Sequence, residues 1–170
     1  MNPLTALSAE ELIAWNDTTA RRWHAFFSAN PAALALPCDI HATPTDPHTV
    51  AHFLQHIVAA QLRHAQRLAG QLIDDYDAIP GLTPDDFLIS HDRTLTLLRS
   101  LLADPTIDWA GPMEFQTLTA GRRRSSRRTL LFHSMLHGIR HYAQLATLIR
   151  QAGYTPNIPG DYLLMDAHPA

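Results

Sequence analysis

The stretch "RRTLLFHSMLHGIRHYAQLATLIRQAG", residues 127–153, carries a helical pattern between two clear ends. Ser125 or Ser126 can cap its start, because a serine hydroxyl accepts a hydrogen bond from a free backbone N–H of the first turn. Gly153 stands where a helix commonly ends in a left-handed residue. The sequence therefore predicts a long last helix, and the same kinds of signal predict the helices before it.

Three histidines of this helix, His133, His137 and His141, recur every four residues. Four residues turn about 400° and rise about 6 Å, so the three side chains form a stripe on one face. The outer two are about 12 Å apart along the axis, too far to share one ion at about 2.1 Å from each nitrogen. Adjacent pairs can converge on a metal, as two histidines at this spacing do in metalloproteases.

Three more segments with apolar residues at steps of three and four precede the last helix. Ser8 and Glu11 have capping-box spacing, and Thr83 with Pro84 is a strong start signal. The predicted helices span about residues 9–29, 48–70 and 83–104. The predicted apolar face of the first is Leu12, Trp15, Thr19, Trp23 and Phe26.

Four amphipathic helices with no convincing sheet predict an all-α fold, a four-helix bundle in a single domain over residues 1–170. A short alternating piece around Phe115, Thr117 and Leu118 is compatible with a small β-hairpin before the last helix. The link over residues 71–82 could run back along a helix if extended, so an up-down order is not forced. The proline-rich stretch after the first helix and the segment after Gly153 are expected to be irregular.

Composition limits the partners and the location. The 170 residues are 46% hydrophobic and 17% charged, with a net charge of −3, so no global attraction to nucleic acid or an anionic membrane is expected. Nothing near the start resembles a signal peptide, and no apolar run approaches 18 residues, so we expect a cytoplasmic protein. The lone Cys38 excludes an internal disulfide and is interpreted as a packing residue.

A metal held by a histidine pair needs a further ligand from another helix. The segment 48–70 offers His52, His56 and His64, of which His56 lies in the first half beside the apolar face. Three neutral imidazoles would leave one coordination position open for water or a substrate atom. The alternative is that these histidines are ordinary core or boundary groups, which is common for histidines on apolar helix faces.

The remaining histidines show no comparable arrangement, and we expect them in the core, in loops or on the surface. They are His24, His41, His48, His91 and His168, and His133 is expected beside the metal ligands or on the surface. Five arginines crowd positions Arg122 to Arg128, where the helix dipole disfavours positive charge. The favoured interpretation is a solvated loop; an anion-recognition patch for a carboxylate or phosphate, or a nucleic-acid contact, is the alternative.

The segment "FLQHIVAAQLRHAQRL", residues 53–68, together with the last helix resembles the DinB/YfiT-like family of bacterial four-helix metalloproteins. The resemblance implies an up-down-down-up bundle, a homodimer, and a divalent metal held by His56, His137 and His141. Gln144 keeps the last position of the family's His-x-x-x-His-Arg-Gly-Gln pattern.

The sequence departs from the family pattern at three positions. Tyr142 and Ala143 replace the usual Arg-Gly, and Gln61 stands where the family often has Glu. An amide does not titrate, so an acid-base role at Gln61 is in doubt.

The resulting functional hypothesis is a metal-dependent enzyme acting on a small-molecule substrate. Zinc or nickel is preferred, with iron, manganese or copper as alternatives. The candidate reactions are thiol S-transfer in detoxification, with a low-molecular-weight thiol as co-substrate, and metal-assisted hydrolysis. The alternative is a non-catalytic, stress-linked helical dimer that binds a metal or a small ligand.

Overall fold

The computed structural model describes residues 7–40, 48–117, 121–158 and 161–165. Within these residues the chain is mostly helical, with four α-helices and a small antiparallel sheet, as predicted. The helices are α1 (Ala9–Ala29), α2 (Val50–Leu68), α3 (Pro84–Ala103) and α4 (Arg127–Gln151). Strands β1 (Pro112–Thr117) and β2 (Gly121–Ser126) form the hairpin between α3 and α4, although Leu118 lies outside the described residues.

Short 3-10 helices lie in the two segments expected to be irregular and in the link over residues 71–82. They are η2 (Pro31–Ala35), η3 (Tyr76–Ala78) and η4 (Tyr162–Met165). No helix of the described residues is both long and apolar enough to cross a bilayer.

Side chains at the helix ends explain where the helices begin. The Ser8 hydroxyl accepts from the Glu11 backbone N–H, and the Glu11 carboxylate accepts from the Ser8 N–H, which completes the predicted capping box of α1. Ser126, one of the two predicted candidates, caps α4 by accepting from the Thr129 N–H. Gly153 has φ +88° just after α4, a left-handed conformation that glycine adopts without strain.

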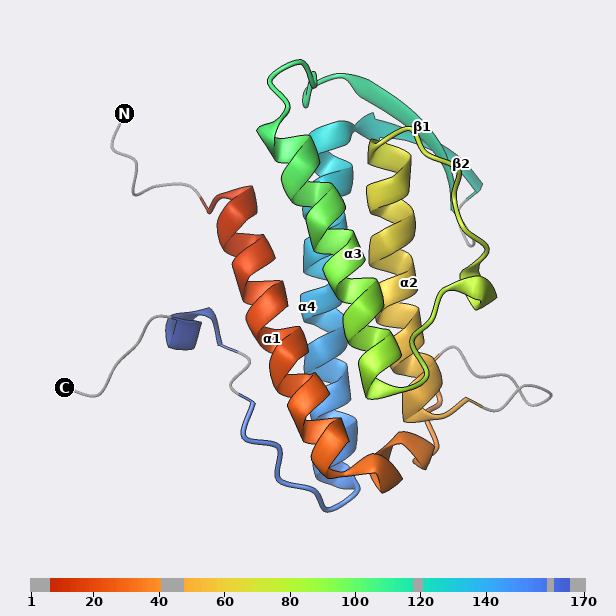
Figure 1. Cartoon of the computed structure of the whole chain (residues 1–170), viewed down its shortest axis with the longest axis vertical. Helices are drawn as coiled ribbons and strands as arrows, with labels where there is room; N and C mark the ends of the chain where they lie inside the picture. Colours follow the sequence, from red (N-terminus) through yellow and green to blue (C-terminus); the bar gives the residue numbers. More distant parts are fainter. Residues whose placement is uncertain (1–6, 41–47, 118–120, 159–160, 166–170) are drawn as a thin grey trace.

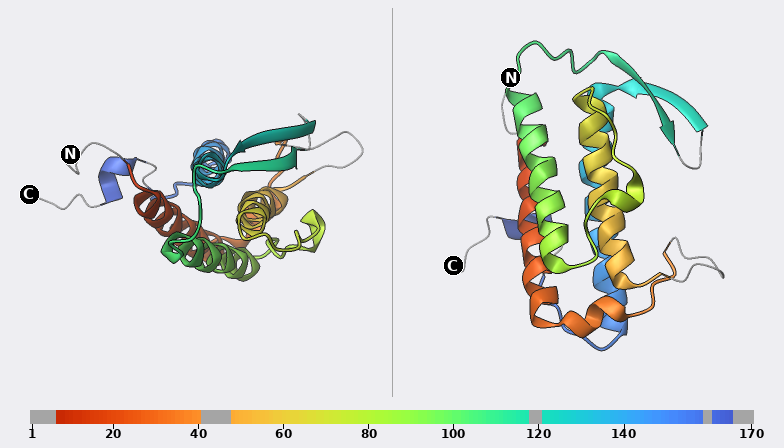
Figure 2. Two further views of the ribbon diagram at one scale, coloured as in Figure 1. Left: turned by 90° about the horizontal axis from the view of Figure 1, so that it is seen from above. Right: turned by 45° about the vertical axis from the view of Figure 1, so that its right-hand side comes forward.

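The four helices lie side by side, with α2 and α3 running in one direction and α1 and α4 in the other (Figure 1). Helix α2 contacts both α3 and α4, and α1 also contacts both. The chain between α2 and α3 returns along the outside of α2 through η3, and the hairpin lies at the end where α4 begins (Figure 2). Helices α2 and α4 therefore pack against each other along much of their length.

The helices bury an apolar core along their axes, with large side chains such as Trp23, Phe27 and Phe53 fully enclosed. The predicted face of α1 is buried at Leu12, Thr19 and Trp23, and half-buried at Trp15 and Phe26, which pack against the core. The next residue, Phe27, occupies the core, and Phe26 packs edge-on against it at a ring centroid distance of 5.1 Å. Helical steps of 3.6 residues let either position continue the stripe, and packing selects one.

A polar contact interrupts this core where α1, α2 and α4 approach closely. Gln61 and Asn16 are 1% and 0% exposed, and Gln61 Nε2 donates to Asn16 Oδ1 at 2.9 Å. Asn16 in turn donates to the Leu12 carbonyl oxygen at 2.9 Å. A Cβ atom on Gly138 of α4 would lie 2.4 Å from Gln61 Nε2 and 2.6 Å from Asn16 Oδ1, so only glycine fits there.

We expect Gly138→Ala to destabilise the protein by about 1–3 kcal/mol, the usual cost of overpacking a core. Helix propensity alone predicts the opposite, a gain of about 1 kcal/mol, because alanine replaces glycine inside a helix. Urea unfolding followed by circular dichroism measures the difference. A variant as stable as the parent, or more stable, would show that Gln61 and Asn16 move aside at little cost.

Candidate metal centre

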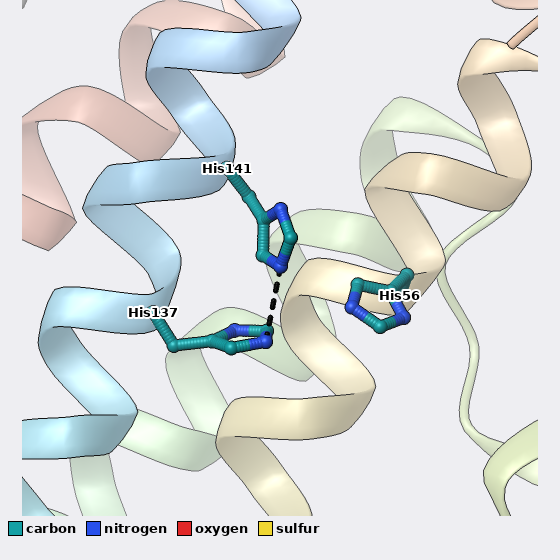
Figure 3. A group of neighbouring side chains, drawn as sticks. All are labelled: His56, His137 and His141. Atoms are coloured by element: carbon teal, nitrogen blue, oxygen red, sulfur yellow. Dashed lines mark hydrogen bonds between the residues drawn. The ribbon is translucent and has the colours of Figure 1, made fainter. Parts of the chain in front are cut away.

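Three imidazoles from two helices converge between α2 and α4 (Figure 3). His137 and His141 stand one turn apart on α4, and His56 faces them from α2. One potential ligand atom of each ring lies within 4.8 Å of those of the other two. The Nε2 atoms of His137 and His141 are 3.0 Å apart. Nitrogens around one ion at about 2.1 Å are separated by roughly 3–3.5 Å, so the spacing of His137 and His141 matches that of two ligands of one metal ion.

Neighbouring side chains orient two of the three rings. His141 Nδ1–H donates to Gln144 Oε1 at 2.6 Å, which leaves Nε2 as the nitrogen turned toward the centre. The Tyr76 hydroxyl donates to the His56 carbonyl oxygen at 2.9 Å and contacts His56 Nδ1, so its oxygen accepts from Nδ1–H. Hydrogen bonds of this kind fix the tautomer and ring orientation of metal-binding histidines.

Burial keeps the His137 ring unprotonated, so that it can bind a cation. His141 is 2% exposed and His137 is half-buried. Burial, followed by the charges of the neighbouring His141 and His56, lowers the pKa of His137 to about 2. His137 is therefore neutral near pH 7 and can act as a ligand without first losing a proton.

The donor set fits a divalent transition metal. It consists of nitrogen atoms from three imidazoles, the ligands that suit zinc, nickel, copper and iron. The two Nε2 atoms are 3.0 Å apart, so their lone pairs would repel unless a proton or a metal ion lay between them. Protonating either ring to a positively charged imidazolium is costly at a buried site. Three protein ligands would leave a coordination position open, as in catalytic zinc sites.

The other histidines of α2 and the first of the α4 stripe lie outside this group. His52 is exposed, and its Nδ1 accepts from the Thr49 backbone N–H at the start of α2. His64 and His133 meet edge to face one level further along the two helices, with ring centroids 5.4 Å apart. His133 is exposed, and its ring centroid is 5.7 Å from that of His137, so it borders the centre.

The histidines without a predicted role are spread over the molecule. His24 pairs with Asp85 at the surface at 2.9 Å, and the ring of His48 stacks on His52 with centroids 5.1 Å apart. His41 and His168 lie outside the described residues. His91 is 0% exposed and lies in the core, one of the places expected for these histidines beside loops and the surface.

A second group, Asp17, His91 and Asp92, joins α1 to α3 and was not predicted from the sequence. His91 Nε2 lies 3.5 Å from Asp17 Oδ1, and this contact is the main cause that lowers the pKa of Asp17 to about 2. Arg21 bridges both carboxylates at 2.8 and 2.7 Å, and Arg99 reaches Asp17 at 3.3 Å. The carboxylates are thus already neutralised by guanidinium groups, so this group acts as a helix–helix ion-pair network.

The half-buried His64 predicts a loss of stability in acid. Burial lowers the pKa of His64 to about 3 from an ordinary value of 6.5, and Arg67 contributes next. Between these values the unfolded chain binds a proton that the folded chain does not, so stability is complete above pH 6.5 and falls as the pH drops toward 3. From pH 7 to pH 5 we expect the free energy of unfolding of the parent to fall by on the order of 1 kcal/mol relative to that of His64→Gln. Urea unfolding at both pH values checks this, and a difference between the two proteins that is independent of pH contradicts it.

The arginine cluster lies on the hairpin and the first turn of α4. Arg122, Arg123 and Arg124 of β2 are exposed, and Arg122 pairs with Glu114 across the hairpin. The Arg128 guanidinium lies over the Phe132 ring at 5.2 Å. About ten residues of helix, or about 15 Å along the axis, separate this cluster from His137, so it is not part of the histidine group.

The sequence model of the DinB family matches residues 8–170, essentially the whole chain. The chain belongs to the DinB family. A search of curated proteins found no match. The resemblance seen in the segment 53–68 and the last helix is thereby confirmed, and the histidines of this DinB protein that match the family pattern are the three that converge in Figure 3.

Two residues of this DinB protein make contacts that the sequence did not predict. Gln61, at the family's frequent Glu position, is in the core against Asn16, so its amide supports packing between helices. Tyr76 borders the candidate metal centre as the partner of His56, although it lies in a link where no periodicity marks it.

Proposed function

We propose that this DinB protein is a metal-dependent enzyme in which His56, His137 and His141 hold one divalent cation. The observation that carries the proposal is the convergence of the three rings, with ligand atoms within 4.8 Å of one another. The hydrogen bonds of His141 to Gln144 and of His56 to Tyr76 support it, because they turn the ligating nitrogens inward. Zinc or nickel is the proposed ion, and iron, manganese or copper would suit the same ligands.

The proposed reaction is thiol S-transfer to a small electrophile, with metal-assisted hydrolysis as the second candidate. A bound divalent ion lowers the pKa of a thiol or water molecule that occupies its open position, which makes a nucleophile available near neutral pH. The chain's own contribution is to hold the rings between packed helices and to keep His137 neutral by burial. The sulfur then forms a bond to the electrophilic carbon, the leaving group departs with its electron pair, and the thiol proton goes to solvent.

We also propose a topology, an oligomeric state and a cellular location for the enzyme. We assign the helices to an up-down-down-up bundle of DinB/YfiT type in one domain over residues 1–170, which the helix directions in Figure 1 support. A cytoplasmic homodimer acting on a small molecule, with a low-molecular-weight thiol as partner, is the proposed working form. Exposed apolar side chains, including Ile89 at 62% and Leu136 at 49%, are compatible with a protein surface in such a dimer.

Metal removal tests the function directly. Untagged protein is analysed for bound metals, treated with a chelator, and reloaded with zinc or nickel. Turnover is then measured with a panel of low-molecular-weight thiols and a chromogenic electrophile such as 1-chloro-2,4-dinitrobenzene. We expect activity in the loaded protein, loss on chelation and recovery on reloading. Full metal content without turnover across the thiol panel and a panel of ester substrates would favour the non-catalytic helical dimer.

A further inference from the structure

Arg140 of α4 lies directly against the candidate metal centre. It precedes His141 and follows His137 by three residues, so it shares their face of the helix. Its Nη2 atom is 3.1 Å from His141 Nε2, the nitrogen that the Gln144 contact leaves for a metal. After burial, the charge of Arg140 is the next cause that lowers the pKa of His133, which places the guanidinium over this part of the α4 face.

Arg140 makes no ion pair with a carboxylate among the described residues. Other arginines of the chain do, such as Arg21 with Asp17 and Arg93 with Asp74. The Arg140 side chain is exposed, and within the described residues it hydrogen-bonds to the ring of His141. Its charge therefore has no counter-ion in the part of the chain that the structure describes.

A cation in the histidine group and the Arg140 hydrogen bond cannot use the same lone pair. The lone pair of His141 Nε2 accepts one partner at a time, so Arg140 must turn away when a metal binds. The guanidinium then carries five unused N–H donors beside a second positive charge. Two cations this close repel each other, and an anion lying between them removes the repulsion.

We propose that Arg140 is a specificity-determining residue that binds the carboxylate of a small anionic substrate beside the metal centre. A single guanidinium presents two parallel N–H donors, which match the two oxygens of a carboxylate. This inference rests on the proposed function and narrows its substrate class to compounds that carry a carboxylate near the reacting group.

The test measures anion binding rather than activity. Wild-type protein and Arg140→Met are loaded with cobalt(II), and acetate is titrated while the visible absorption of the cobalt is recorded. We expect acetate to bind at least about tenfold more weakly to Arg140→Met, and cobalt itself to bind as tightly or more tightly, because the competing N–H donor is gone. Arg140→Lys keeps the charge without the paired donors and should be intermediate.

Arg150→Met is the matched control, because Arg150 is an exposed arginine of the same helix, about 15 Å further along its axis. Its acetate affinity should equal that of the wild type. Equal acetate binding by wild type and Arg140→Met, with cobalt bound in both, overturns this inference and leaves the proposed function standing. Failure of the wild type to bind cobalt overturns both.

Discussion

Replacing His137 with alanine is expected to lower the affinity for a divalent metal at least about 100-fold without changing the helical content. His137 is central to the group, since its Nε2 atom lies 3.0 Å from that of His141 and its ring centroid is 5.4 Å from that of His56. Losing one of three ligands should exceed the about 10–100-fold loss that follows removal of a supporting hydrogen bond. Competition between the protein and a chromophoric chelator for zinc measures the affinity, and circular dichroism measures the helices.

His133→Ala is the matched control for this experiment. His133 stands on the same helix, one four-residue step before His137, but lies outside the group of three. Its removal should leave zinc affinity within about threefold of the wild type, which is less than about 0.7 kcal/mol. Equal losses in His133→Ala and His137→Ala would show that the stripe as a whole, and not the convergent trio, binds the ion.

The second large effect is expected at Gln144, which touches no ion itself. Gln144→Leu removes the acceptor of the 2.6 Å hydrogen bond from His141 Nδ1–H. The ring then loses the partner that fixes its tautomer and orientation, and zinc affinity should fall about 10–100-fold. The same chelator competition measures this loss.

Gln151→Leu provides the comparison for Gln144→Leu, since it makes the same change at an exposed glutamine at the end of α4. Its zinc affinity should not change. If Gln144→Leu also binds zinc like the wild type, Gln144 does not orient His141, and the pattern position is retained for another reason.

The helices were predictable because their signals are local. Capping residues, glycine and proline mark the ends of α1, α3 and α4, and steps of three and four residues mark the buried faces. The four-residue spacing of His137 and His141 also decides that these rings share a face before any tertiary structure is known. What local signals could not decide was which of two neighbours is fully enclosed, as Phe27 is while Phe26 is half-buried beside it.

The rest of the site depends on how the helices pack against one another. Of the three histidines of α2, His52 is at the cap and His64 faces His133, so only His56 is level with the α4 pair. Tyr76 reaches His56 because the link from α2 returns along that helix, a path that the sequence only permits. Gln61 is buried, and its contact with Asn16 of α1 depends on how these two helices pack.

Anomalous diffraction from a crystal of the zinc-loaded protein tests the central claim most directly. Data collected on both sides of the zinc absorption edge locate the ion without assumptions about its ligands. We expect one peak per chain between α2 and α4, about 2.1 Å from a nitrogen of each of His56, His137 and His141. A peak elsewhere, or three rings that remain without an ion at saturating zinc, would contradict it.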